Sequence, residues 1–179
     1  MHTARRTLVG AVLTVLGILG SVLVAPSPAQ AYGTLTVKYA VVDTGNCARL
    51  RGSLPVTKVS GGCMLYDSFD DTYFETDDGG IAVKIELYDS YGMVAKVEFH
   101  PSGEKLWVYD TRNDGDTVYV FINYSLNGAT YGPFNAEGTD DVLDYDVFDF
   151  DWIEDKPFGV QVTDSASVYD PIFSERGRS

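Results

Sequence analysis

The sequence has few of the residues on which catalysis and nucleic-acid binding commonly depend. It contains two histidines and two cysteines among 179 residues, and its 26 acidic residues outnumber 13 lysines and arginines. The formal net charge of −13 repels nucleic acid and anionic lipid, and no basic cluster offsets it. Nucleic acids and membrane surfaces are therefore not expected partners. His2 belongs to the predicted signal peptide, so after its cleavage only His100 could serve as the base of a Ser–His pair, and its place beside Pro101 is typical of an exposed turn.

The chain also lacks helical periodicity after its first 31 residues. Its long apolar run, residues 7–25, follows Arg5 and Arg6 and leads through two prolines to an Ala-x-Ala sequence ending at Ala31. This order predicts a signal-peptide helix, residues 1–31, that is cleaved to leave a secreted, extracellular protein. The run could span a bilayer, so an uncleaved anchor is the alternative. Cleavage would leave 148 residues, enough for one domain, with a net charge of −15.

The two cysteines, Cys47 and Cys63, predict a single disulfide in an oxidising compartment. Closing this loop would stabilise the fold by about 3 kcal/mol in the chain-entropy picture. A redox pair would need the Cys-x-x-Cys spacing, and a zinc site would have only His100 to complete it. We therefore predict a structural disulfide, no metal site and no cofactor.

Alternating apolar and polar residues from Ile81 to Phe134 predict an antiparallel meander. Its first hairpin is internally consistent if Ser90-Tyr91-Gly92 forms a three-residue loop with Gly92 in the left-handed conformation. A loop of even length would place every apolar residue opposite a polar one. The predicted register pairs Ile85 with Val97, Val83 with Phe99, and Asp89 with Met93; the next turn pairs His100 with Lys105, Phe99 with Leu106, and Val97 with Val108.

The polar side of the first hairpin carries two predicted opposite-charge pairs, Glu86 with Lys96 and Lys84 with Glu98. We expect these pairs on an exposed face. Glu86 and Glu98 are also the best-placed carboxylates for sugar hydrolysis, so a small secreted carbohydrate-active hydrolase is the alternative function. A general acid needs a raised pKa, however, and a lysine beside each glutamate lowers the pKa.

The rest of the chain predicts further short strands. Between residues 142 and 153 the alternation changes phase at Val147-Phe148, which predicts a bulge, and Asn127-Gly128 predicts a two-residue hairpin turn. The fold predicted for residues 32–164 is a single all-β domain, an antiparallel two-sheet sandwich of immunoglobulin-like or related kind. Residues 165–179 are expected to form a flexible C-terminal tail. Other strands are predicted over residues 34–42, 63–67, 105–110, 117–126 and 158–163.

Three short segments resemble a known group of proteins. They are Lys96-Val97-Glu98-Phe99, Gly103-Glu104-Lys105-Leu106-Trp107-Val108-Tyr109-Asp110 and Asp114-Gly115. They resemble the central part of small exported proteins of uncharacterised function found in actinomycetes. The resemblance covers residues 94–165 and implies a compact β-sandwich, and it implies no catalytic residue.

Aromatic residues provide the candidate binding site. With the aliphatic residues of the meander turned inward, Trp107, Tyr109, Tyr119 and Phe121 gather on the opposite face. Exposed aromatic clusters mark binding sites, so we predict that these rings hold a sugar, a peptide or a partner strand by stacking. The alternative is that residues 132–141 or the cysteine loop cover the rings as a second small core.

Acidic turns offer a weaker candidate for calcium binding. A twelve-residue calcium loop beginning at Asp110 would have Arg112 and Phe121 at two of the positions that need oxygen ligands. Asp114 with Asp116, or Asp140-Asp141, could still bind calcium weakly, although a solvated turn is favoured. The sequence as a whole predicts a non-catalytic extracellular module that binds a glycan or a protein.

Overall fold

The computed structural model describes residues 32–138 and 143–179, and within them the chain is all-β, as predicted. The predicted signal peptide, residues 1–31, and Asp140-Asp141 lie outside the described residues. No helix in the described ranges is long and apolar enough to cross a bilayer. The strands are β1 (Thr36–Asp43), β2 (Ala48–Gly52), β3 (Thr57–Val59), β4 (Gly62–Leu65), β5 (Thr72–Glu75), β6 (Ile81–Tyr88), β7 (Met93–His100), β8 (Lys105–Asp110), β9 (Tyr119–Tyr124), β10 (Ala129–Phe134), β11 (Asp144–Asp149), β12 (Pro157–Thr163) and β13 (Pro171–Arg178).

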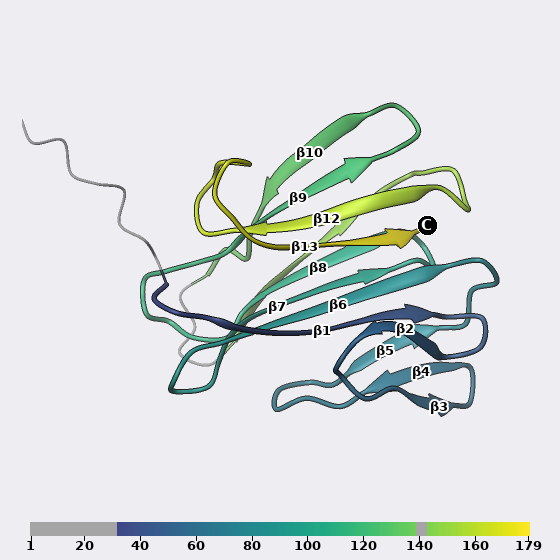
Figure 1. Ribbon diagram of the computed structural model, residues 1–179, viewed down its shortest axis with the longest axis horizontal. Helices are drawn as coiled ribbons and strands as arrows, with labels where there is room; N and C mark the ends of the chain where they lie inside the picture. Colours follow the sequence, from purple (N-terminus) through teal and green to yellow (C-terminus); the bar gives the residue numbers. More distant parts are fainter. Residues whose placement is uncertain (1–31, 139–142) are drawn as a thin grey trace, which may run out of the picture.

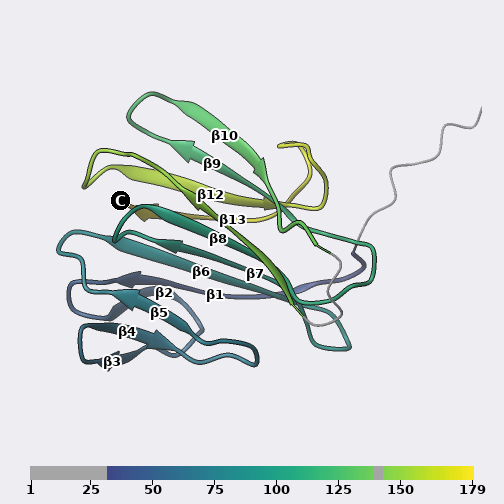
Figure 2. The ribbon, with the colours of Figure 1, turned by 180° about the vertical axis from the view of Figure 1, so that it is seen from behind.

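The strands form a large antiparallel sheet and a small one (Figure 1). The ten-stranded sheet runs β10-β9-β12-β13-β6-β7-β8-β11, with β1 paired to β6 and β2 paired to β1. The three-stranded sheet runs β3-β4-β5 and lies beside β1 and β2 (Figures 1 and 2). Within the large sheet, β13 pairs with β6 at one position only, Arg178 opposite Ile81. The sheet is therefore joined weakly at its middle.

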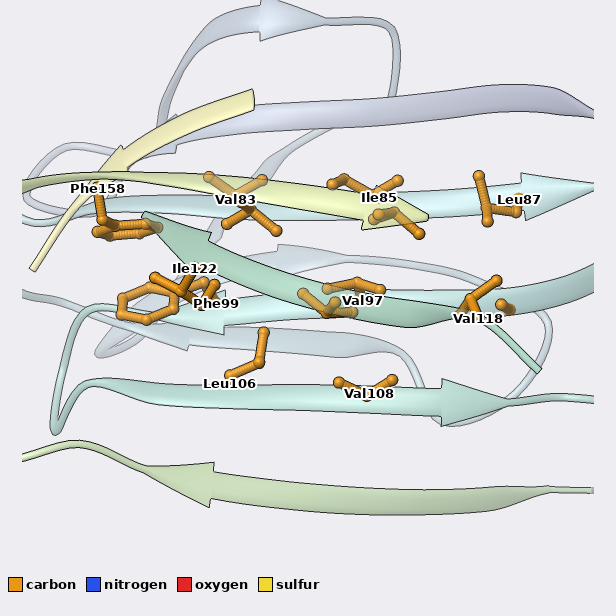
Figure 3. Close-up of a cluster of buried hydrophobic side chains, with 14 of the residues drawn as sticks. Val83, Ile85, Leu87, Val97, Phe99, Leu106, Val108, Val118, Ile122 and Phe158 are labelled. Carbon is orange, nitrogen blue, oxygen red and sulfur yellow. The ribbon is translucent and has the colours of Figure 1, made fainter. Parts of the chain in front are cut away.

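The large sheet curves so strongly that both of its ends contribute to one core. Aliphatic side chains of β6, β7 and β8 face Val118 before β9, Ile122 on β9 and Phe158 on β12, and Figure 3 shows these side chains gathered between the strands. Aromatic rings close the gap between the end strands β10 and β11. Phe134 lies 4.6 Å from Phe148 and 5.5 Å from Phe150, measured between ring centroids.

The predicted register of the meander is confirmed along most of its length. Ile85 pairs with Val97 and Val83 with Phe99, and in the next hairpin His100 pairs with Lys105. Gly92 has a positive φ of 142°, which glycine adopts readily, but the predicted three-residue loop is wrong because the loop spans the four residues 89–92. At the loop itself the register shifts by one, and Tyr88 rather than Asp89 pairs with Met93. The reason is that the Asp89 carboxylate accepts hydrogen bonds from the backbone N–H groups of residues 91 and 92.

The bulge predicted at Val147-Phe148 is wrong. β11 pairs with β8 in unbroken register from Asp144 opposite Asp110 to Asp149 opposite Lys105. Alternation is preserved because Tyr145 and Val147 lie on the outer face, 52% and 39% exposed, while Phe148 packs against the core. The apolar residues Tyr145 and Val147 on the exposed face therefore gave the sequence the appearance of a shifted alternation, although the strand has no bulge. The Asn127-Gly128 hairpin is present, but four residues separate the paired Tyr124 and Ala129.

The flexible tail predicted for residues 165–179 is also wrong, because residues 171–178 form β13 in the middle of the large sheet. β13 pairs with β12 along its length, and the Phe173 ring lies 4.8 Å from that of Tyr39. Gly177 permits this close packing. A Cβ at this position would lie 2.4 Å from Phe158 Cζ and 2.6 Å from the Ile81 carbonyl oxygen.

The segment between β1 and β6 forms a small lobe with its own core. The predicted disulfide is confirmed and joins Cys47 to Cys63 on β4, with a Cα–Cα distance of 5.4 Å. Because alternate residues of β1 face opposite sides, Val37 and Tyr39 pack against the main core while Ala40 and Val42 pack into the lobe. The lobe core also contains Leu54, Cys63, Leu65, Phe74 and Ala82.

Candidate functional site

The outer face of β6 and β7 carries charged side chains that are fully buried. Lys84, Glu86, Lys96 and Glu98 are each at most 1% exposed, so the expectation of an exposed charged face is wrong. Side chains of the lobe, Asp67 and Thr72 among them, bond directly to these residues. The alternation of β6 and β7 shows which side chains share a face, but not what lies over that face. We call these four residues with Asp67 the charged layer.

The ion pairs of the charged layer run along each strand and not across the hairpin. Lys84 Nζ lies 3.0 Å from Glu86 Oε1, and Lys96 Nζ lies 3.0 Å from Glu98 Oε1. Both ammonium groups also contact Asp67 Oδ2, at 2.8 Å and 3.0 Å. Asp67 is therefore the bridge through which the lobe neutralises two lysines at once.

Hydrogen bonds and neighbouring charges keep Asp67 and Glu98 of the charged layer ionised in spite of their burial. Burial acts to raise the pKa of Asp67, but bonds from Lys84, Lys96 and the backbone lower it to about 2. Burial likewise opposes ionisation of Glu98, yet His100, Lys96 and Thr72 hold its pKa below the usual value. Its carboxylate accepts a hydrogen bond from Thr72 Oγ1 at 2.5 Å. A general acid requires the opposite shift, so Glu98 is unsuited to protonating a leaving group.

Lys96 also occupies the place that a metal would take in this layer. Oxygens of Asp67, Asp70 and Glu98 lie within 4.8 Å of one another, the kind of spacing that could hold an ion. Lys96 Nζ contacts all three carboxylates. The ammonium group therefore supplies the positive charge that the three carboxylates need.

Aromatic side chains cover the outer face of β8 and β11, next to the charged layer. Trp107 stacks on Tyr145 with 5.6 Å between centroids and 22° between planes, and on Tyr109 at 6.2 Å and 15°. Tyr145 is 52% exposed, Trp107 is half-buried and Tyr109 is buried. We call these three residues the aromatic ledge.

Tyr109 fixes the ledge to the charged layer beneath it. Lys96 Nζ lies 4.2 Å from the centroid of the Tyr109 ring, a cation–π contact in a dry environment. Burial, with the nearby carboxylates of Glu98 and Asp70, raises the pKa of the Tyr109 hydroxyl. Tyr109 is thus neutral and its ring is held in place by Lys96, while Trp107 and Tyr145 expose part of their rings to solvent.

A hollow of about 230 Å³ adjoins the ledge at Trp107. Its walls carry hydrogen-bonding groups: Ser102 Oγ donates to Glu75 Oε2 at 3.0 Å, and His100 Nε2 lies 2.8 Å from Glu98 Oε2. The site thus combines flat rings with polar groups that are already oriented. The hollow is lined by Tyr73, Glu75, His100, Ser102, Lys105 and Trp107.

The structure separates the four aromatic residues proposed from the sequence. Trp107 and Tyr109 lie together, but Tyr119 and Phe121 lie on the outer face of β9, which pairs with β10 and β12 and not with β8. Phe121 is 5% exposed. Sequence reasoning missed Tyr145, which pairs with Tyr109. The available signal was that Tyr145 and Phe148 are three residues apart and so lie on opposite faces of one strand.

The acidic turn after β8 is organised by an arginine. Arg112 Nη1 lies 2.6 Å from Asp89 Oδ2 and 3.8 Å from Asp114 Oδ2. Burial, together with Asp114 and Asp144, raises the pKa of Asp110 to about 6. A guanidinium group already neutralises this turn in part, which makes Asp114 with Asp116 a weaker calcium candidate.

Comparison of the chain with protein-family models, with curated proteins and with solved structures gave no match. The site must therefore be interpreted from its own chemistry.

Proposed function

We propose that the protein is an extracellular binding module whose aromatic ledge and adjoining hollow hold a carbohydrate chain. The observation that carries this proposal is the stacked pair Trp107 and Tyr145 beside a hollow lined with polar groups. Sugar rings present flat C–H faces that stack on aromatic side chains, and hydroxyl groups that bond to oriented donors and acceptors. Glu75, Ser102 and His100 offer such groups within the hollow. A protein partner is the second candidate ligand.

A second hollow of the protein is less suited to sugar. It measures about 860 Å³ and lies on the outer face of β9, β12 and β13. Its lining includes Arg51, Gly159 and Arg176, and its one aromatic residue, Phe158, is buried in the main core. Without an exposed ring it lacks the stacking surface that the ledge provides.

The hydrolase alternative is weakened by the burial of its best carboxylate pair. Glu86 and Glu98 are 1% exposed and each lies against a lysine. A substrate would have to displace the lobe to reach them. Binding without catalysis therefore accounts better for the ledge.

The compartment and the finer architecture belong to the same proposal. Secretion through a cleaved signal peptide accords with the Cys47–Cys63 disulfide, since disulfides persist in oxidising compartments. We further propose that the two halves of the large sheet, joined at one position between β13 and β6, act as the layers of a β-sandwich. The resemblance to small exported actinomycete proteins stays a prediction.

A glycan array and polysaccharide pull-down with the purified protein would test the proposal. We expect Trp107→Ala and Tyr145→Ala to weaken binding about ten-fold or more, or about 1.4 kcal/mol. Tyr145 is the cleaner variant, because its exposure makes a loss of folding small. Tyr91→Ala and Tyr169→Ala are matched controls, since these rings are 89% and 92% exposed and lie in other loops. The ledge would not be the binding site if Tyr145→Ala bound glycan as tightly as the wild type, or if the two controls lost as much affinity as the ledge variants.

A further inference from the structure

The backbone nitrogen of Tyr32 is bonded to a carboxylate that comes from a distant part of the chain. Its N–H donates to Asp164 Oδ1 at 3.2 Å, and the two residues are buried, at 7% and 8% exposure. The Tyr32 ring packs into the main core. Tyr32 is also the residue that follows Ala31, where the predicted signal peptide ends. Cleavage there would turn this buried N–H into the α-ammonium group of the mature protein.

Asp164 is held in position by the turn between β12 and β13. Its backbone N–H donates to the carbonyl oxygen of Asp170 at 3.1 Å. The hydroxyl of the preceding residue, Thr163, donates to the carbonyl oxygen of Ser165 at 2.7 Å. The Asp164 carboxylate therefore projects from a backbone that is already fixed on both sides.

Negative charge dominates the surroundings of Tyr32. Burial, followed by the charges of nearby carboxylates, raises the pKa of the Tyr32 hydroxyl. Arg112 also lies near, but its guanidinium group already contacts Asp89 and Asp114. A cation at the Tyr32 nitrogen would thus add positive charge where carboxylates are in excess. The carboxylates close to Tyr32, or lining the hollow of about 220 Å³ beside it, are those of Asp110, Asp114, Asp116, Asp164 and Asp170.

The contact between Tyr32 and Asp164 also joins the two halves of the large sheet. Tyr32 leads into β1, which pairs with β6, whereas Asp164 follows β12, which pairs with β13 and β9. Within the described residues β13 pairs with β6 at one position, Arg178 opposite Ile81, where β6 begins. β1 begins beside the other end of β6. The Tyr32–Asp164 contact therefore fastens the halves at the end where β13 and β6 do not pair.

We propose that cleavage after Ala31 creates a buried ion pair between the α-ammonium group of Tyr32 and the carboxylate of Asp164, which locks the two halves of the sheet together in the mature protein. The inference rests on the proposed export through a cleaved signal peptide and is independent of the sugar site. A signal peptidase of the exporting cell would hydrolyse the Ala31–Tyr32 bond with one water molecule. The hydroxyl joins the Ala31 carbonyl carbon, a proton joins the Tyr32 nitrogen, and the proton of the new carboxyl group passes to the amine at neutral pH.

The new charge should strengthen the contact and make it depend on pH. Hydrogen bonds with an ionised donor or acceptor are about twice as strong as neutral ones, and here both partners are ionised. A free α-amino group has a pKa of about 7.7–8.0, and a carboxylate partner raises the pKa in the folded protein. The contribution to stability should therefore be fully present below about pH 7 and be lost as the pH rises through the raised folded-state pKa.

Thermal unfolding of three forms of the protein would test the ion pair. One begins at Tyr32 with a free amine, the second is the same chain acetylated at that amine, and the third begins at Ala29. Acetylation reproduces the peptide bond that precedes Tyr32 in the uncleaved chain, so it keeps the N–H donor and removes the charge. At pH 6.5 we expect the free-amine form to have a Tm about 3 °C or more above the other two. This gap should narrow as the pH is raised towards 11.

Asp164→Asn, which keeps the shape of the side chain, should lower the Tm of the free-amine form and remove most of the gap. Asp151→Asn is the matched control, since Asp151 is exposed, and it should preserve the gap. If Asp164→Asn fails to fold, the comparison of free and acetylated wild type decides the question. Equal Tm values for those two forms at pH 6.5, or an undiminished gap in Asp164→Asn, would overturn the ion pair.

The cleavage position has a separate test. Mass spectrometry of the protein exported by cells that express the full chain should find Tyr32 at the N-terminus. A different N-terminus would overturn the maturation step, even where the chain beginning at Tyr32 shows the expected gap in Tm. The two results thus distinguish a failure of the predicted cleavage from a failure of the ion pair.

Discussion

Asp67 holds the charged layer together, and replacing it with asparagine should destabilise the protein strongly at neutral pH. The substitution keeps the shape of the side chain but leaves Lys84 and Lys96 without their shared counter-ion, although their bonds to Glu86 and Glu98 remain. Lowering the Asp67 pKa from 3.8 to about 2 corresponds to about 2.5 kcal/mol of folding free energy. Removing one partner of a buried ion pair typically costs about 3–5 kcal/mol. We therefore expect a loss of about 3 kcal/mol.

The pH dependence provides a stricter test than the loss itself. Because the pKa of Asp67 is lower in the folded than in the unfolded protein, its contribution is fully present above about pH 5. It disappears as the pH falls through the folded-state pKa of about 2. The difference in unfolding free energy between wild type and Asp67→Asn should hence be constant from pH 7 to 5 and shrink between pH 4 and 2.

Urea unfolding followed by tryptophan fluorescence at several pH values would measure both effects. Asp151→Asn, which changes an exposed aspartate, is the control and should alter stability by less than about 0.5 kcal/mol. The double variant Asp67→Asn/Lys84→Met should lose less than the sum of its single changes, since it removes both partners of one pair. A loss below about 0.5 kcal/mol for Asp67→Asn at pH 7, or one that persists unchanged to pH 2, would refute a bridging role for Asp67.

Two further predictions concern the lobe and the last strand. Reducing the disulfide, or replacing Cys47 and Cys63 by serine, should lower the unfolding free energy by about 3 kcal/mol, as measured by urea unfolding with and without reductant; an unchanged midpoint would contradict this. Gly177→Ala should lower the unfolding free energy by about 1–3 kcal/mol, because its methyl group would overlap the Phe158 ring and the Ile81 carbonyl. Gly33→Ala is the control, since a Cβ at that position would have nothing within 4 Å. Equal Tm values for the two variants would show that β13 tolerates the methyl group.

The parts of the fold that the sequence predicts are those determined by neighbouring residues. Alternation and the matching of apolar faces are enough to place Ile85 opposite Val97 and His100 opposite Lys105, because a register shift of one would reverse every side chain. The order of strands that are distant in the sequence is not encoded in this way. β8 pairs with β11, which lies more than thirty residues further along, and the assumption that β9 adjoined β8 placed Tyr119 and Phe121 in the wrong group.

The burial of the charged face shows a second limit. Lys84 and Glu98 alternate with apolar residues as the exposed residues of a sheet normally do. What makes them buried is a segment some twenty to thirty residues earlier, which carries Asp67 and packs Leu65 and Phe74 against the sheet. The acidic residues of that segment were a usable signal, since two lysines on one face need counter-charges if they are to be covered.

The exposed rings and the hidden charges are two consequences of one arrangement. The lobe covers the outer face of β6 and β7, whereas the neighbouring outer face of β8 and β11 carries the half-buried Trp107 and the exposed Tyr145. Lys96 of the charged layer touches the ring of Tyr109, and Glu98 of the same layer orients His100 in the hollow. The charged layer thus fixes both the ring beneath the ledge and one wall of the hollow. These contacts hold the proposed binding surface in place before any ligand arrives, which would lower the entropy lost on binding a sugar chain.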